Sequence, residues 1–214
     1  MMRRRSLINI FSRSYSAVVR DSAELTKIIK SELKHEQNTL PYYLIKNELG
    51  SVGNFTLEWD KSESKDVVLR RKNEFGEEIA VSALLGPPIA EEEEEIHKKG
   101  LFPNTGLMKV CIKKPGLSSI LQFDCGCIGK CEGGSEFSIQ NAYYLPSSSS
   151  LGDSVYRGPL FSTLDPRLQD ALKDYLRARG IVEDFTDFLL HHLHKREYVH
   201  YMEWLQKLDS SVRA

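Results

Sequence analysis

Residues 164–169 read LDPRLQ, the stretch of this sequence that indicates its fold most directly. Asp165 is placed to cap a helix, and Pro166 stands at the first helical position, where its missing N–H costs no hydrogen bond. Apolar residues then recur every three or four positions as far as Gly180, a natural C-terminal stop. A second helix is predicted over 182–208, at ~1.5 Å per residue about 40 Å long. Neither predicted helix contains a catalytic motif. Their apolar stripes indicate that each helix buries one face against another part of the protein.

The middle of the chain is predicted to form strands, because its apolar residues alternate with polar ones. The predicted strands are 55–59, 67–75, 79–85, 107–113, 119–125 and 137–145. In the first strand, Phe55, Leu57 and Trp59 are expected on one side. In the last strand, the shared face is expected to hold Phe137, Ile139, Asn141 and Tyr143. With a first helix predicted over 21–37, the order helix, antiparallel meander and two helices makes an α+β fold.

Residues 86–106 interrupt this pattern with a Gly-Pro-Pro turn and an acidic run, as expected of a long solvated loop. The candidate partner-binding residues are in this run: Glu91, Glu92, Glu93, Glu94 and Glu95. Concentrated negative charge attracts a basic partner over a distance. A solvated loop without a specific partner is an equally open alternative.

The N-terminus is typical of a mitochondrial transit peptide. Residues 1–20 contain five arginines, several serines and no acidic residue, and they can form an amphipathic helix. Residues 13–16 resemble a matrix-protease site with cleavage after Tyr15. We therefore expect residues 1–15 to be the transit peptide, with a disordered basic tail as the alternative for this segment. Residues 16–214 are expected to form one domain in the mitochondrial matrix. No stretch approaches the ~20 apolar residues of a membrane span.

The charge balance favours protein partners over nucleic acid. The chain has 29 basic and 30 acidic residues, a net charge of −1, and loss of the four arginines before residue 16 changes the net charge to −5. Broad binding of a phosphate backbone needs clustered Lys and Arg, so basic proteins or presequence-like segments are the favoured partners. The alternative, an RNA- or ribosome-associated factor, depends on a local basic patch of Arg70, Arg71, Lys72, Lys113 and Lys114.

Five segments carry a resemblance to a known family: FSIQN at 137–141, YRGP at 156–159, LDPRLQ at 164–169, YLRARGI at 175–181 and YMEWL at 201–205. They resemble the mitochondrial acidic matrix protein family, also called the mitochondrial glycoprotein family, which includes the globular-head complement receptor protein. The resemblance implies a twisted seven-stranded antiparallel sheet flanked by one N-terminal and two C-terminal helices, and a ring-shaped homotrimer. It implies no catalytic residues. The implied roles are chaperone-like support of respiratory-complex assembly or of mitochondrial translation and RNA processing.

The four cysteines could in principle form a thiolate zinc site. Cys125, Cys127 and Cys131 form a C-x-C-x3-C cluster, with Cys111 on the preceding predicted strand. This spacing differs from the usual C-x2-C knuckles, so reduced thiols in a strand-end loop are the favoured interpretation.

The last predicted helix carries histidines and aromatic residues. Of His191, His192, His194 and His200, only His191 and His194 are one turn apart and could share a ligand, so a surface helix is favoured over a metal site. Tyr198, Tyr201 and Trp204 could form a binding stripe, but core or subunit packing is the favoured role. We thus predict a non-enzymatic protein with no catalytic, cofactor or metal residues.

Overall fold

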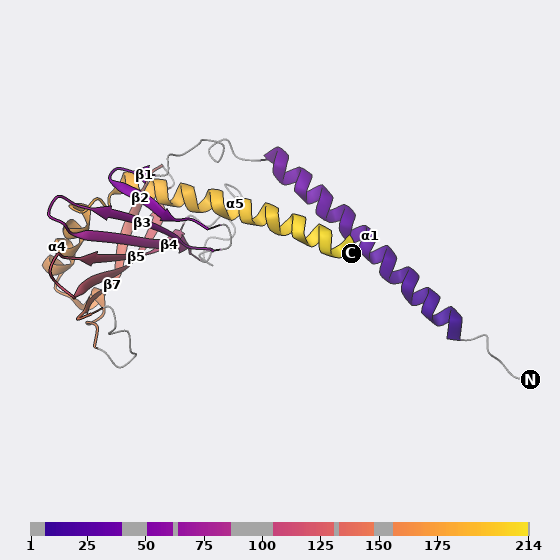
Figure 1. Cartoon of the computed structure of the whole chain (residues 1–214), viewed down its shortest axis with the longest axis horizontal. Helices are drawn as coiled ribbons and strands as arrows, with labels where there is room; N and C mark the ends of the chain where they lie inside the picture. The colour runs from indigo at the N-terminus through magenta and orange to yellow at the C-terminus, as the bar shows by residue number, and fades with distance from the viewer. Residues whose placement is uncertain are drawn as a thin grey trace, which may run out of the picture. The chain divides into compact units, whose positions relative to one another are not determined.

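The computed structural model describes residues 7–39, 51–61, 64–86, 105–130, 133–147 and 156–213, and in the first range it describes side chains from Ser22 onward. Seven strands form one antiparallel sheet, in which each strand pairs with its neighbours in sequence (Figure 1). The strands are β1 (Ser51–Val52), β2 (Phe55–Trp59), β3 (Val67–Lys72), β4 (Glu78–Leu85), β5 (Thr105–Lys113), β6 (Ile120–Gly129) and β7 (Ser135–Leu145). The helical elements are α1 (Leu7–Thr39), the 3-10 helix η2 (Phe161–Thr163), α4 (Pro166–Arg177) and α5 (Glu183–Arg213). The predicted α+β fold, with a seven-stranded sheet, one N-terminal helix and two C-terminal helices, is confirmed.

The chain forms two compact units. One unit, Asn47–Arg196, contains the sheet, η2, α4 and the first part of α5. The other unit consists of Met1–Lys46 and Glu197–Ala214, and so contains α1 and the last part of α5.

A tight turn between β3 and β4 shows why consecutive strands pair. The Asn73 side chain accepts hydrogen bonds from the N–H groups of Phe75 (3.0 Å) and Glu77 (2.9 Å). Gly76 adopts a φ of 77°, a left-handed conformation that glycine enters without strain. The turn sets the register of the hairpin from Lys72 opposite Glu78 onward.

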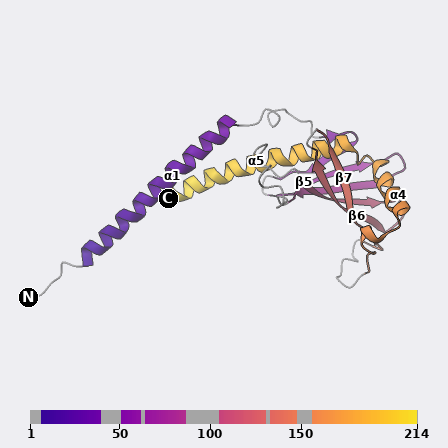
Figure 2. The ribbon, with the colours of Figure 1, turned by 180° about the vertical axis from the view of Figure 1, so that it is seen from behind.

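The two faces of the sheet differ in what lies on them. The covered face packs against α4 and the first part of α5, and α4 is seen on this side of the sheet in Figure 2. Val67 and Leu69 of β3 point to this face and are 0% exposed, whereas Arg70 points to the opposite, outer face and is exposed. Core members from α4 and α5 are Leu176, Phe185, Leu189, Leu190 and Leu193. Ile181, in the connection between these two helices, also belongs to the core. The aromatic rings of Phe55 and Phe185 join sheet to helix, with 4.7 Å between their centroids.

A β-bulge in β2 overturns the prediction that Trp59 shares a side with Phe55 and Leu57. Leu57 lies opposite Leu69, but Trp59 lies opposite Val68. Glu58 is therefore an extra residue of β2 that has no residue opposite it on β3. The extra residue reverses the alternation, and Trp59 points to the outer face, where it is 41% exposed.

A second bulge corrects the prediction for β7. Ile139 pairs with Cys125 and Asn141 with Asp124, so the register shifts by one residue between them. Ala142, opposite the buried Phe123, packs against the core instead. Asn141 and Tyr143 therefore do not share a face with Phe137 and Ile139, as the sequence alternation had predicted.

Several element ends also differ from prediction. The strand predicted over 67–75 ends at Lys72, because Asn73 starts the turn, and the strand predicted over 119–125 continues to Gly129. The two-residue β1 is too short to show an alternation. Helix α1 begins at Leu7 rather than at residue 21, so it includes much of the segment predicted as a transit peptide.

Candidate functional site

The acidic run that supplied the predicted partner-binding residues, Glu91–Glu95, lies outside the described residues. All five segments that carry the family resemblance lie within the described residues. Their contacts show which parts of the molecule are built for stability and which leave polar groups at the surface.

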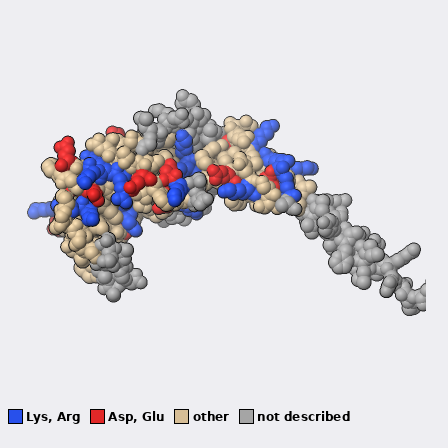
Figure 3. Space-filling view, viewed as in Figure 1, with Lys and Arg blue, Asp and Glu red and all other residues tan. Residues whose placement is uncertain are grey.

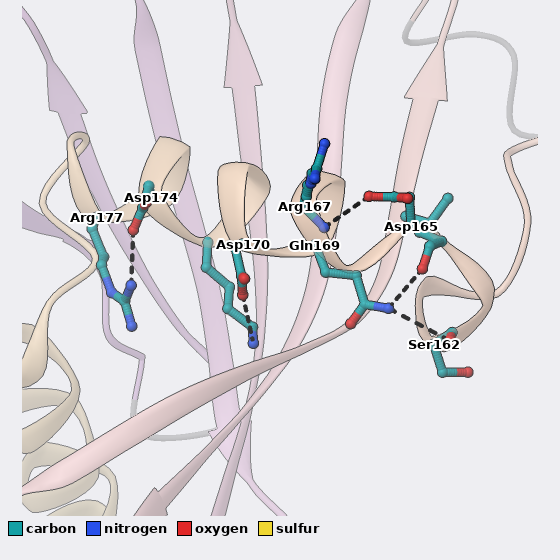
Figure 4. Close-up of polar contacts among 9 residues, drawn as sticks. Ser162, Asp165, Arg167, Gln169, Asp170, Asp174 and Arg177 are labelled. Atoms are coloured by element: carbon teal, nitrogen blue, oxygen red, sulfur yellow. Dashed lines mark hydrogen bonds and ion pairs between the residues drawn. The ribbon is translucent and has the colours of Figure 1, made fainter.

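The LDPRLQ stretch forms the start of α4 as predicted (Figure 4). The Asp165 carboxylate accepts a hydrogen bond from the Arg167 N–H at 2.9 Å, and Pro166 is the first helical residue. The Gln169 amide donates back to the Leu164 carbonyl at 2.9 Å and to the Ser162 carbonyl at 3.5 Å. These bonds connect the helix to the preceding 3-10 turn, so the stretch has a structural role.

The YLRARGI stretch ends in a buried ion pair. The guanidinium of Arg179 binds the carboxylate of Glu77 with an Nη2–Oε1 distance of 2.8 Å, and the Asn73 amide donates to the other carboxylate oxygen at 2.8 Å. Hydrogen bonding from Arg179 is the main reason why the pKa of Glu77 is lowered, although burial opposes it. Arg179 also lies over the ring of Tyr175, 3.4 Å from the centroid. The pair ties the end of α4 to the β3–β4 turn.

Arg71, on the covered face of β3, also contacts the end of α4. Its guanidinium donates to the Arg179 carbonyl at 3.0 Å and lies 5.8 Å from the centroid of the Phe55 ring. Gly180 follows with a φ of 90°, and a Cβ there would be 2.5 Å from Arg71 Nη1. The glycine that the sequence marks as a helix stop is favoured by this positive φ, and a Cβ would in addition displace the Arg71 side chain.

A second charged junction ties α5 to the connection between β2 and β3. Arg196 is 9% exposed and forms an ion pair with Asp60, which also contacts His192 Nε2 at 3.1 Å. Arg196 Nη2 donates to the Lys61 carbonyl at 2.8 Å and to the Ser64 carbonyl at 2.6 Å. Sequence reasoning missed this site because its members are more than 130 positions apart. It missed the Glu77–Arg179 pair because these two residues are 102 positions apart.

The predicted basic patch is divided between the two faces of the sheet. Arg71 points to the covered face, whereas Arg70 and Lys72 point to the outer face. There, Arg70 pairs with Glu58, and Lys72 lies 3.9 Å from Glu78. Basic and acidic side chains accordingly interleave over the sheet in Figure 3. At Arg70 and Lys72 the surface therefore has mixed charge, unlike the clustered Lys and Arg that bind a phosphate backbone.

The three cysteines within the described residues are divided between the two faces of the sheet. Cys111 points to the outer face, while Cys125 and Cys127 are buried on the covered face; Cys131 lies outside the described residues. Burial raises the pKa of Cys125 to about 12 and that of Cys127 to about 11, so both remain thiols at neutral pH. Among the described residues, no group of three or more His, Cys, Asp or Glu side chains could hold a metal ion.

The histidines of α5 have separate surroundings. His192 contacts Asp60 and stacks on Phe188 with 5.8 Å between ring centroids, and His194 is buried at 8% exposure. His192 therefore takes part in the charged contacts around Asp60, and His194 takes part in packing.

The aromatic stripe near the end of α5 contacts α1. The hydroxyls of Tyr198 and Tyr201 donate to the Glu36 carbonyl and to the Glu32 carboxylate, each at 3.1 Å. Trp204 stacks on Tyr201 and is 55% exposed. Packing is thus shown for the two tyrosines, as favoured, while Trp204 remains at the surface. No helix in the described part of the chain is long and apolar enough to cross a membrane.

These features define a class: a one-sided antiparallel meander, covered by two C-terminal helices that charged junctions hold in place, with a mixed-charge outer face. The sequence matches the profile of the mitochondrial glycoprotein family over residues 29–212. The chain belongs to this family, and the resemblance seen in the sequence is confirmed.

Known relatives agree with this assignment. The mitochondrial acidic protein mam33 of Schizosaccharomyces pombe is 27% identical in an alignment of 239 positions, gaps included. The alignment covers 94% of this chain and 84% of the relative. A solved structure from Leishmania major, a hypothetical protein of unknown function described as a sequence homologue of human p32 protein, is similar with a TM-score of 0.67. It covers 90% of this chain and 99% of its own, and at 17% identity it shows the shared fold alone.

Proposed function

We propose that this protein is a non-enzymatic binding protein of the mitochondrial matrix, which assembles as a homotrimer and acts as a chaperone for basic segments of client proteins during respiratory-complex assembly. The observation that carries the proposal is the family match over residues 29–212, together with the name of the fission-yeast relative as a mitochondrial acidic protein. The arginine-rich, acid-free residues 1–20 support import into mitochondria.

The charge of the mature protein supports the choice of basic partners. Cleavage after Tyr15 leaves a net charge of −5, and a negative protein field raises the association rate of positively charged partners. The acidic run Glu91–Glu95 is the proposed place where this field is strongest.

The quaternary part of the proposal is tested by the solution mass of the protein that begins at Ser16, measured by light scattering. A mass near three times that of the monomer supports the trimer, and a monomeric mass contradicts it. Replacing all five residues of the acidic run by glutamine keeps their size and removes their charge. That variant is expected to bind a presequence-like basic peptide more weakly at low salt, with an unchanged solution mass.

The respiratory part is tested in cells that lack the protein. Native electrophoresis of their mitochondria should show fewer assembled respiratory complexes, and the restored full chain should reverse the loss. Normal complex levels in the deleted cells would contradict this role.

Association with RNA or ribosomes is the second candidate, supported by the basic residues Arg70, Lys72 and Lys113. It has less support, because Arg70 and Lys72 are matched by Glu58 and Glu78. Salt-sensitive retention of RNA by the pure protein would favour it. Indifference to RNA at low salt would exclude it.

A further inference from the structure

Trp59 occupies a position that burial does not explain. Simple alternation along β2 would place its indole in the core beside Leu57, yet the bulge at Glu58 turns it to the outer face. There 41% of the residue is exposed. Leaving a large apolar side chain exposed loses the free energy that its burial would contribute to stability. Bulges are common next to functional sites, where they turn a side chain toward the site.

The re-aimed indole forms one wall of a surface hollow. The hollow has a volume of about 300 Å³, and its lining residues are Glu58, Trp59, Ser64, Asp66, Val68 and Arg70. We call it the Trp59 hollow. This volume is at the lower end of the range for ligand pockets. It suits one long side chain of a protein partner better than a cofactor.

The chemistry of the hollow favours a cation. Glu58 and Asp66 contribute two carboxylates, of which Glu58 pairs with Arg70. Asp66 accepts a hydrogen bond from the Ser64 hydroxyl, a neutral partner that leaves its negative charge in place. The face of an indole ring attracts cations through its quadrupole.

A cation of the chain itself already lies on this ring. Lys61 Nζ is 4.0 Å from the centroid of the Trp59 ring. The contact shows that the ring face is accessible to a positively charged group. It also means that an incoming cation competes with Lys61 for the ring.

The rim of the hollow is held in place from α5. Arg196 donates to the carbonyls of both Lys61 and Ser64 and pairs with Asp60. These bonds fix the two ends of the connection that carries Lys61 and leads to Asp66. A site whose groups are positioned before binding loses less entropy when the ligand arrives.

We propose that the Trp59 hollow binds an arginine side chain of a basic protein segment, with the guanidinium stacked on Trp59 in place of Lys61 and hydrogen-bonded to Asp66. Arginine is favoured over lysine because its planar group can stack on an aromatic ring and donate two parallel hydrogen bonds to one carboxylate. The proposal rests on the proposed function, since it names the place and the side chain by which basic clients are held.

The test uses the full mature protein carrying Trp204→Phe, which leaves Trp59 as the one tryptophan of the two in the chain. The probe is an acetylated, amidated peptide of alternating alanine and arginine, and the control peptide contains neutral citrulline in place of arginine. Tryptophan emission reports the hollow, and anisotropy of a fluorescein-labelled peptide reports total binding. The arginine peptide is expected to change the emission of Trp59, and the citrulline peptide to leave it unchanged.

Three variants locate the site. Trp59→Leu and Asp66→Asn should each weaken peptide binding about tenfold, whereas Lys61→Ala should tighten it about threefold because the competing ammonium is gone. A gain of affinity cannot come from misfolding. Asp174→Asn, which removes an exposed carboxylate of α4, is the matched control and should bind like the parent.

The outcomes separate this proposal from the wider function. If the parent binds the peptide but the three variants bind with unchanged affinity, the Trp59 hollow is not the site, and binding of basic segments stands. If anisotropy shows no binding to the parent at low salt, both proposals are overturned.

Discussion

The covered and outer faces of the sheet differ in how far the side chains of the same strands are buried. On β3, Leu69 is 0% exposed beneath the helices, while its neighbour Arg70 is exposed on the outer face. Polar groups on the covered side form buried pairs such as Glu77–Arg179, whereas those of the outer side, such as Arg70 with Glu58, form exposed pairs. The difference teaches that buried packing and buried ion pairs are concentrated on one side of the sheet, whereas the other side carries exposed side chains.

The largest loss is expected from breaking the Glu77–Arg179 junction. Arg179→Ala leaves a buried carboxylate without its cation and should lower the free energy of unfolding by about 3–5 kcal/mol. The matched control is Arg177→Ala, whose guanidinium is exposed and pairs with Asp174, with an expected loss of at most about 1 kcal/mol. Urea unfolding of both variants measures the contrast. Equal losses would show that the junction contributes no more than a surface pair.

Two leucines compare the faces directly. Leu69→Ala opens a cavity under the helices and should cost about 2–5 kcal/mol, with about 3 kcal/mol as the central expectation. Leu84→Ala, on the outer face at 39% exposure, should cost less than about 1 kcal/mol. Denaturant midpoints at constant m-value measure both. A large loss at Leu84 would mean that this part of the outer face is covered in solution.

Acid should weaken the covered side through Glu77. Its pKa is lowered in the folded protein, so its contribution to stability is fully present above its ordinary value of 4.5 and is lost as the pH falls through the lowered pKa. The effect should be smaller than that of Arg179→Ala, because a protonated carboxyl still accepts a hydrogen bond. Thermal unfolding between pH 6 and pH 3 should show a steeper loss for the parent protein than for Glu77→Gln. Parallel curves for the two proteins would contradict this account.

The smallest effect is expected at the cap of α4. Asp165→Ala removes the acceptor for the Arg167 N–H and should cost about 1 kcal/mol in thermal or urea unfolding. Asp170→Ala is the control, since it breaks only an exposed pair with Lys173 and should cost less than about 0.5 kcal/mol. A cap variant as stable as its control would show that Pro166 alone is sufficient to start the helix.

Elements whose signals are local were predicted well. The start of α4 at Pro166 follows from cap chemistry within three residues, and β2 was predicted with its observed bounds. The ends of longer strands were less accurate, because side-chain alternation does not show where pairing stops. The turn chemistry of Asn73 ended β3 three residues before the predicted strand end at Phe75.

The sequence by itself determined the fold class, the family and the two C-terminal helices. Periodicity, helix caps and family motifs depend only on residues that are close together in the sequence. Only the tertiary structure decided that Trp59 faces outward, that Arg71 and Arg70 belong to different surroundings, and that Arg196 holds Lys61 and Ser64. The physical reason is that a bulge changes the facing of a side chain by one residue, and its presence depends on the partner strand. Ion pairs between residues more than a hundred positions apart likewise form only when packing brings the charges together.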